Sequence, residues 1–69
     1  GDDSDELFDE AVATVRDAKK ASASLLQRRL KVGYARAARL LDLMEARGIV
    51  GPGDGAKPRE VFVENAENG

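Results

Sequence analysis

Residues 51–58 hold three glycines and two prolines, so this stretch of the chain cannot be helical. Short segments of β-branched and aromatic residues flank it, Ile49–Val50 before and Val61–Val63 after. Such segments around a turn-forming run are typical of a β-hairpin with a long tip. Upstream of residue 48, apolar residues recur at helical spacing in three stretches. We therefore predict a mainly α fold with a small β-hairpin, in the order three helices and then a wing.

The first helix is predicted to begin near Asp5, with Asp3 or Ser4 as its cap, and to end at Lys19 and Lys20. Its apolar stripe comprises Phe8, Ala11, Val12, Val15 and Ala18. The acidic residues around this start favour a helix N-terminus over a metal site.

The second helix is predicted to begin with a capping box formed by Ser24 and Gln27, and residues 21–23 before it can pair briefly as an extended segment. Leu26 and Leu30 should face the core, while Arg28, Arg29 and Lys31 stay in solvent. The helix should end by residue 31 or 32, because Gly33 offers a break and the freedom of positive φ.

The third helix is predicted from about Tyr34 to Arg47, closed by Gly48. Its buried stripe should comprise Tyr34, Ala37, Ala38, Leu41 and Met44, with Ala35, Arg36, Arg39, Asp42 and Leu43 on the other side. Two helices joined by a short turn with a glycine are typical of a helix-turn-helix. The following hairpin makes the predicted architecture a winged helix-turn-helix.

The 69 residues are enough for one small domain, and they include no cysteine and no histidine. Disulfides, thiolate or imidazole metal sites and histidine-based catalysis are thereby excluded. No apolar run approaches the roughly 20 residues of a membrane-spanning helix, and no signal peptide opens the chain. We expect a cytoplasmic domain cut from a longer protein: residues 1–4 disordered or tag-derived, residues 5–63 the winged helix, and residues 64–69 a flexible polar tail.

The net charge of −2 conceals a strong segregation. Residues 1–10 carry six acids and no bases, whereas residues 11–47 carry nine bases against three acids. The middle of the chain therefore bears a local charge of +6, which favours a polyanionic partner despite the acidic total. Residues 51–57 superficially resemble a phosphate-binding loop, but Ala56 separates Gly from Lys and the run precedes a predicted strand. This pattern favours a hairpin tip over a nucleotide-binding loop.

The predicted recognition helix places Arg36 and Arg39 on its exposed face, where a helix-turn-helix contacts base edges. Predicted DNA-backbone contacts are Gln27, Arg28 and Lys31 on the preceding helix, and Lys57 and Arg59 at the wing. The residues leave two alternatives open: a solvated surface, and a winged helix that serves only to dock another protein. An enzyme is disfavoured, since scattered carboxylates are the only candidate catalytic groups, and no cofactor or metal is expected in this domain.

Two stretches of the sequence resemble the C-terminal γ domain of the FtsK/SpoIIIE DNA translocases. They are QRRLKVGYARAARLLDLMEARGIV at residues 27–50 and KPREVFV at residues 57–63. The resemblance runs from about residue 7 to residue 63. It implies a winged helix that reads short, asymmetric, G-rich sequences on double-stranded DNA and so orients a hexameric motor during chromosome segregation and cell division. In some members of that family the domain also activates the XerCD recombinase.

The resemblance also implies roles for individual residues. Arg39 corresponds to the family's base-contacting arginine, with Ala35 and Asp42 on the same face; Arg36 matches the first arginine of the motif, and Lys57 resembles a wing residue near the backbone. Relatives often carry Asn or Thr where this chain has Ala35, which offers only apolar contact to a base. ATP and Mg²⁺ are expected only for the motor, and the parent protein is expected to be anchored in the bacterial inner membrane with this domain on the cytoplasmic side.

Overall fold

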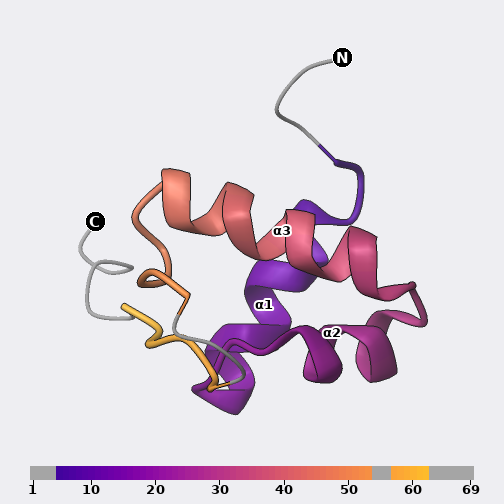
Figure 1. Cartoon of the computed structure of the whole chain (residues 1–69), viewed down its shortest axis with the longest axis horizontal. Coiled ribbons are helices and arrows are strands. Elements are labelled where there is room, and N and C mark those ends of the chain that lie inside the picture. Colours follow the sequence, from indigo (N-terminus) through magenta and orange to yellow (C-terminus); the bar gives the residue numbers. More distant parts are fainter. Residues whose placement is uncertain (1–4, 54–56, 63–69) are drawn as a thin grey trace.

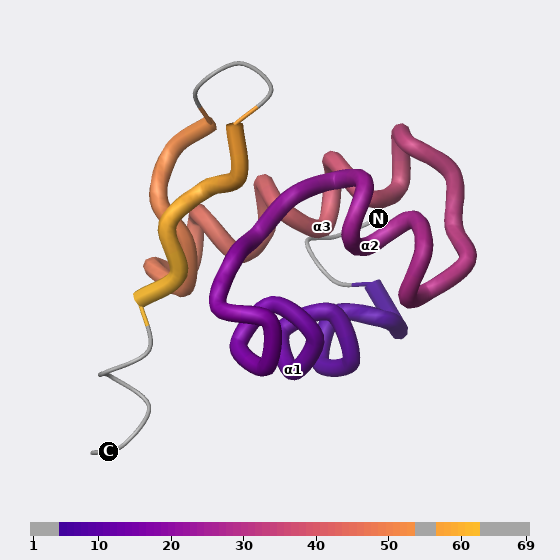
Figure 2. Tube along the Cα trace, turned by 90° about the horizontal axis from the view of Figure 1, so that it is seen from below, coloured from indigo at the N-terminus to yellow at the C-terminus, as the bar shows by residue number. Residues whose placement is uncertain are grey.

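Three helices pack around one small core in the computed structural model, which describes residues 5–53 and 57–62. They are α1 (Phe8–Ala18), α2 (Ala23–Leu30) and α3 (Tyr34–Ala46), and α3 packs most extensively on α2 (Figure 1). We call residues 49–53 and 57–62 the C-terminal segments. They lie beside the C-terminal end of α3, at the opposite end of the domain from the α2–α3 turn (Figure 2).

The core of α3 differs from the predicted stripe at three positions. Buried residues of α3 are Ala37, Leu40, Leu41 and Met44. Tyr34, predicted to be buried, is 66% exposed, and Leu40, absent from the prediction, is completely buried. Tyr34 lies at the first position of α3 and borders a groove that residues of α2 also line, where most of the residue stays in contact with solvent. Ala38 is only half-buried.

Helix α1 begins at Phe8, three residues later than predicted. Asp5 instead supports the turn before the helix: its Oδ1 accepts a hydrogen bond from the Leu7 N–H at 2.9 Å, and its carbonyl accepts one from the Phe8 N–H at 2.8 Å. The predicted caps, Asp3 and Ser4, lie outside the described residues. The predicted end is confirmed, since Lys19 adopts a left-handed conformation with φ of 60° directly after Ala18.

Helix α2 is capped by Ser22, so the predicted capping box at Ser24 is wrong. Ser22 has extended backbone, and its Oγ accepts a hydrogen bond from the Leu25 N–H at 3.1 Å. The preceding residue, Ala21, forms an antiparallel bridge with Arg59, which keeps the chain extended until residue 22. The predicted brief pairing of residues 21–23 is therefore confirmed at Ala21.

Replacing Ser22 should cost more stability than replacing Ser24. Ser22→Ala removes the side-chain acceptor of the α2 cap, and loss of such a cap costs about 1 kcal/mol. Ser24 lies exposed in the first turn of the helix, where alanine is a better helix former than serine. We expect urea denaturation to show a clear loss for Ser22→Ala and almost none for Ser24→Ala. Equal losses would mean that Ser22 does not act as the cap.

The turn between α2 and α3 places its positive φ at Lys31 rather than at Gly33. Lys31 has φ of 59°, whereas Gly33 is extended with φ of −78° and ψ of 171°. The predicted role of Gly48 is confirmed, since it has a φ of +74° and follows Arg47, the C-cap of α3. The Ile49 N–H donates to the Met44 carbonyl at 2.9 Å and the Gly48 N–H to the Glu45 carbonyl at 3.0 Å, which together form a Schellman motif.

The predicted β-hairpin is not supported, because the C-terminal segments form isolated bridges and no strand. Val50 pairs with Val61, and Arg59 pairs with Ala21, in both cases antiparallel. The prolines at 52 and 58 lack the N–H that a continuous ladder needs, so pairing stops after single bridges. Residues 54–56, in the middle of the predicted tip at residues 51–58, and residues 63–69 lie outside the part that the structure describes. The mainly helical prediction is confirmed, and the arrangement is consistent with a winged helix-turn-helix.

Candidate nucleic-acid interface

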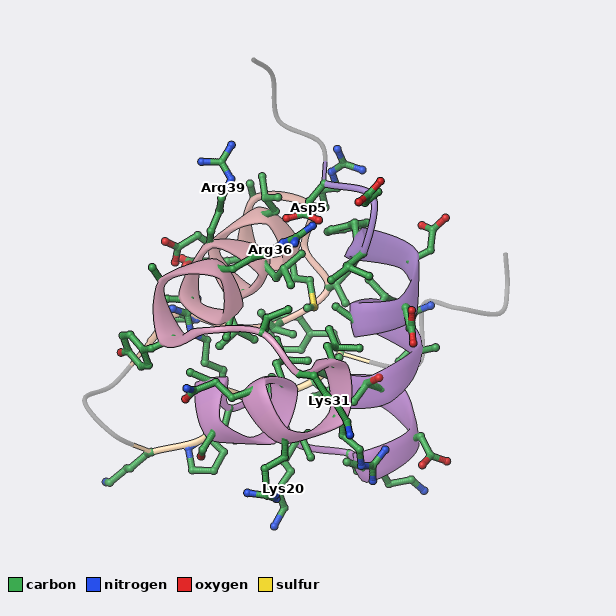
Figure 3. The ribbon with its side chains drawn as sticks, turned by 90° about the vertical axis from the view of Figure 1, so that its right-hand side faces the viewer. Asp5, Lys20, Lys31, Arg36 and Arg39 are labelled. Carbon is green, nitrogen blue, oxygen red and sulfur yellow. The ribbon has the colours of Figure 1, made fainter. Side chains whose placement is uncertain are left out.

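The exposed face of α3 carries three of the predicted base-contacting residues on one stripe. Ala35, Arg39 and Asp42 follow the i, i+4, i+7 spacing that aligns residues along a helix, and all three are exposed. Figure 3 shows Arg39 projecting outward from α3. The Arg39 guanidinium and the Asp42 carboxylate thus belong to residues one helical turn apart on the solvent-exposed surface.

The fourth predicted base-contacting residue, Arg36, is engaged with α1's leading turn. Its Nη2 donates to Asp5 Oδ1 at 2.7 Å and its Nε donates to Asp5 Oδ2 at 3.0 Å (Figure 3). The Asp5 side chain is 8% exposed and that of Arg36 is 43% exposed. A bidentate contact from this edge of Arg36 to guanine would require the ion pair with Asp5 to open. In the free domain, Arg36 therefore joins the turn before α1 to α3.

The Arg36 hydrogen bonds, followed by the one from the Leu7 N–H, lower the pKa of Asp5 from 3.8 to about 2. The same contact raises the pKa of Arg36. A carboxylate whose pKa is lower in the folded than in the unfolded chain stabilises the fold above its unfolded pKa. This stabilisation is therefore fully present above about pH 4 and is lost as the pH falls through about 2.

Asp5→Asn should consequently lower the thermal unfolding midpoint at pH 7 and have little effect near pH 2. Asparagine keeps an oxygen for the Leu7 N–H but loses the charged fork with Arg36. The measurement is the difference in midpoint between wild type and variant from pH 7 to pH 2, because all other carboxylates are common to both. A difference that stays constant over this range would contradict the assigned role of the Asp5 charge.

Arg59, predicted to contact the DNA backbone, is turned toward α3. Its Nη2 donates to Asp42 Oδ1 at 3.1 Å, and its Nη1 donates to Glu45 Oε1 at 3.2 Å and, at 3.5 Å, to the carbonyl of Leu41. The Arg59 side chain is only 15% exposed, whereas that of Asp42 is 70% exposed. Arg59, predicted to contact the DNA backbone, and Asp42, predicted to contact a base, are thus joined by a hydrogen bond in the free domain.

The remaining predicted backbone contacts divide between two places. Gln27 and Lys57 line one groove of about 240 Å³ between the start of α2, α3 and the C-terminal segments. The other residues lining it are Ala21, Ser22, Ala23, Ser24, Tyr34, Ala38, Leu41, Gly53 and Arg59. Arg28 and Lys31 are exposed but do not line this groove, and Figure 3 shows Lys31 well separated from Arg39.

Across α3 from this groove lies a second, shallow hollow. Its lining residues are Asp5, Glu6, Ala35, Arg36 and Arg39. Two residues of the stripe, Ala35 and Arg39, thus border this hollow. An ion pair lies on each side of α3: Arg36 with Asp5 beside the hollow, and Arg59 with Asp42 beside the groove. The sequence did not predict Asp5 as the partner of Arg36 or Glu45 as a partner of Arg59. No local signal could have identified Asp5, which lies 31 residues from Arg36.

Over residues 5–53 and 57–62, no group of three or more Asp, Glu, His or Cys side chains is placed to hold a metal ion. Within the same ranges, no helix has the length and apolar character needed to cross a membrane.

The model of the FtsK γ domain family matches residues 2–64. This chain belongs to that family. It is 56% identical over 66 residues to the DNA translocase FtsK of Sporosarcina ureae and 63% identical over 60 residues to that of Halalkalibacterium halodurans, covering 96% and 87% of this chain. It is also 59% identical over 59 residues, 86% of the chain, to the DNA translocase SpoIIIE of Bacillus subtilis.

The chain spans about 8% of the length of these translocases. The match is to the γ domain, which is a small non-catalytic part of such a protein. The predicted family resemblance is thereby confirmed.

Proposed function

We propose that this γ domain binds double-stranded DNA and reads short, G-rich, asymmetric sequences, and thereby orients a DNA translocase during chromosome segregation and cell division. The observation that carries the proposal is the exposed stripe of Ala35, Arg39 and Asp42 on a helix of the FtsK γ family. A major groove about 12 Å wide admits an α-helix, so this stripe can reach base edges.

Contacts to the DNA backbone would come from α2 and from the C-terminal segments. The groove beside α3 holds Gln27 and Lys57, and Arg28 and Lys31 are exposed on and after α2. These groups can meet phosphates when α3 enters the major groove, because the helix before a recognition helix crosses the backbone. The +6 charge of residues 11–47 supports this placement, since phosphate contacts supply much of the affinity for DNA.

A second function is favoured by one observation, the 66% exposure of Tyr34 at the start of α3. Tyrosine is enriched in protein interfaces, and this ring borders the groove that leads to the C-terminal segments. In this alternative the domain docks a recombinase of the XerCD type, or the motor, and binds DNA only without sequence preference.

The remaining partners belong to the proposed parent protein. Further copies of the domain, held together by a hexameric motor, would raise the effective concentration at a DNA site without new contacts. ATP and Mg²⁺ would act in that motor and not in this domain. The parent would be anchored in the bacterial inner membrane with the γ domain on the cytoplasmic side.

The test is a titration of the domain with a G-rich duplex and with a scrambled duplex of equal length, each at two salt concentrations. The proposal expects tighter binding to the G-rich duplex at both, because base contacts persist when phosphate contacts are screened. Equal binding to both duplexes that disappears at moderate salt would favour the docking alternative.

A further inference from the structure

We propose that Arg59 is a positioning residue for base readout: it holds the Asp42 carboxylate in the orientation that selects cytosine at one position of the DNA site. The inference rests on the proposed function. It differs from the sequence-based prediction, in which Arg59 contacts a phosphate. The observations that carry it are the hydrogen bonds of the Arg59 guanidinium, its burial and the exposure of Asp42.

The guanidinium of Arg59 is fixed from several sides. Its side-chain donors bind Asp42, Glu45 and the Leu41 carbonyl on consecutive turns of α3. Its backbone is fixed as well, since the Arg59 N–H donates to the Ala21 carbonyl at 2.7 Å and the Ala21 N–H donates back at 3.2 Å. With 15% of its side chain exposed, Arg59 has little freedom to leave α3 for a phosphate.

Asp42 is held through one carboxylate oxygen, and most of its side chain faces solvent. Oδ1 accepts from Arg59 Nη2, while the side chain as a whole is 70% exposed. The hydrogen bond from Arg59 uses Oδ1, and a carboxylate has a second oxygen, Oδ2, that can accept from a base. A carboxylate fixed in this way loses less side-chain entropy on binding than a freely rotating one. The positive charge of Arg59 also offsets the repulsion between Asp42 and nearby phosphates.

The second carboxylate oxygen of Asp42, Oδ2, suits one base in the major groove. Cytosine presents the N4 amino group, a donor, whereas guanine presents only acceptors there, O6 and N7. A fixed carboxylate therefore accepts from cytosine and repels guanine, so it discriminates by rejection as well as by attraction. Arg39 lies three residues earlier on the same face, where its guanidinium suits guanine. Both bases are available in a G-rich duplex, one on each strand.

The experiment uses duplexes in which each base pair of the preferred site is changed in turn. Arg59→Lys keeps the positive charge but loses the planar fork that reaches two carboxylates. We expect it to reduce the preference for cytosine at one position by at least about fivefold, the lower end of a single mismatch effect. Preferences at the other positions should stay. Asp42→Asn should lose the preference at the same position, and adding Arg59→Lys to it should change nothing further.

Glu60→Gln is the matched control, because it removes one negative charge from an exposed neighbour of Arg59 and should leave all preferences unchanged. Circular dichroism and thermal melting establish that each variant folds. Arg59→Met, which keeps the aliphatic packing without the fork, replaces Arg59→Lys should the latter not fold, and should show the same positional loss.

Two results would overturn the inference alone: a wild-type preference for cytosine that survives in Arg59→Lys, or an equal loss of affinity for every duplex, as expected for a phosphate contact. Losses that add in the double variant would also overturn it, since Arg59 would then act independently of Asp42. A wild-type domain with no sequence preference at all would overturn the proposed function and this inference with it.

Discussion

Arg39→Ala is expected to bring the affinities of the domain for a G-rich duplex and a scrambled duplex close together. Arg39 lies on the exposed stripe of α3, where its planar guanidinium can donate to guanine O6 and N7 at once. Loss of such a bidentate contact costs about 1–3 kcal/mol and relaxes the sequence preference at that position. The measurement is the ratio of the two dissociation constants, obtained at one fixed salt concentration because phosphate contacts depend on salt.

Lys57→Ala provides the comparison for Arg39→Ala. Lys57 is exposed on the C-terminal segments and lines the groove beside α3, where it can meet a phosphate as a point charge. Its loss should weaken binding to both duplexes alike and reduce the salt slope by about one. If Arg39→Ala leaves the ratio of affinities unchanged while circular dichroism shows a folded variant, α3 does not read guanine through Arg39.

The number and order of the helices could be predicted from the sequence because their signals are local. Apolar spacing identified α1, α2 and α3, and Gly48 marked the end of α3 through its need for positive φ. Local sequence could not decide whether Ser22 or Ser24 caps α2. Both are serines, and the pairing of Ala21 with Arg59 decides between them, which links two segments far apart in the sequence.

The candidate site divides in the same way. The sequence placed Arg39 and Asp42 on one exposed face of α3, which the periodicity of a helix is sufficient to show. It predicted DNA contacts for Arg36 and Arg59 but not their ion pairs, because the partners are distant in the sequence. Asp5 lies 31 residues before Arg36, and Asp42 lies 17 residues before Arg59. Composition therefore identified the cations of this domain, but the fold determines which of them are engaged in ion pairs.

Leu40→Ala is expected to destabilise the domain more than any surface change, by about 2–5 kcal/mol. Leu40 is completely buried in the core cluster that joins α3 to α1 and α2, and alanine leaves a cavity there. A core in a domain of this size rarely supplies more than about 3–5 kcal/mol of net stability. Leu40→Ala should therefore be largely unfolded at 25 °C, which urea denaturation followed by circular dichroism would measure.

Tyr34→Ala is the matched test, because sequence periodicity predicted Tyr34 in the core and omitted Leu40. With 66% of Tyr34 exposed, its loss should change the free energy of unfolding by no more than about 0.5 kcal/mol. Leu40→Met, which conserves volume, should cost less than about 1.5 kcal/mol and so separate the cavity from loss of the leucine itself. A larger loss for Tyr34→Ala than for Leu40→Ala would mean that α3 is rotated toward the predicted stripe. In that case Ala35, Arg39 and Asp42 would still lie on the side of α3 away from the core, as the sequence predicted, but nearer the edge of the exposed face than its centre.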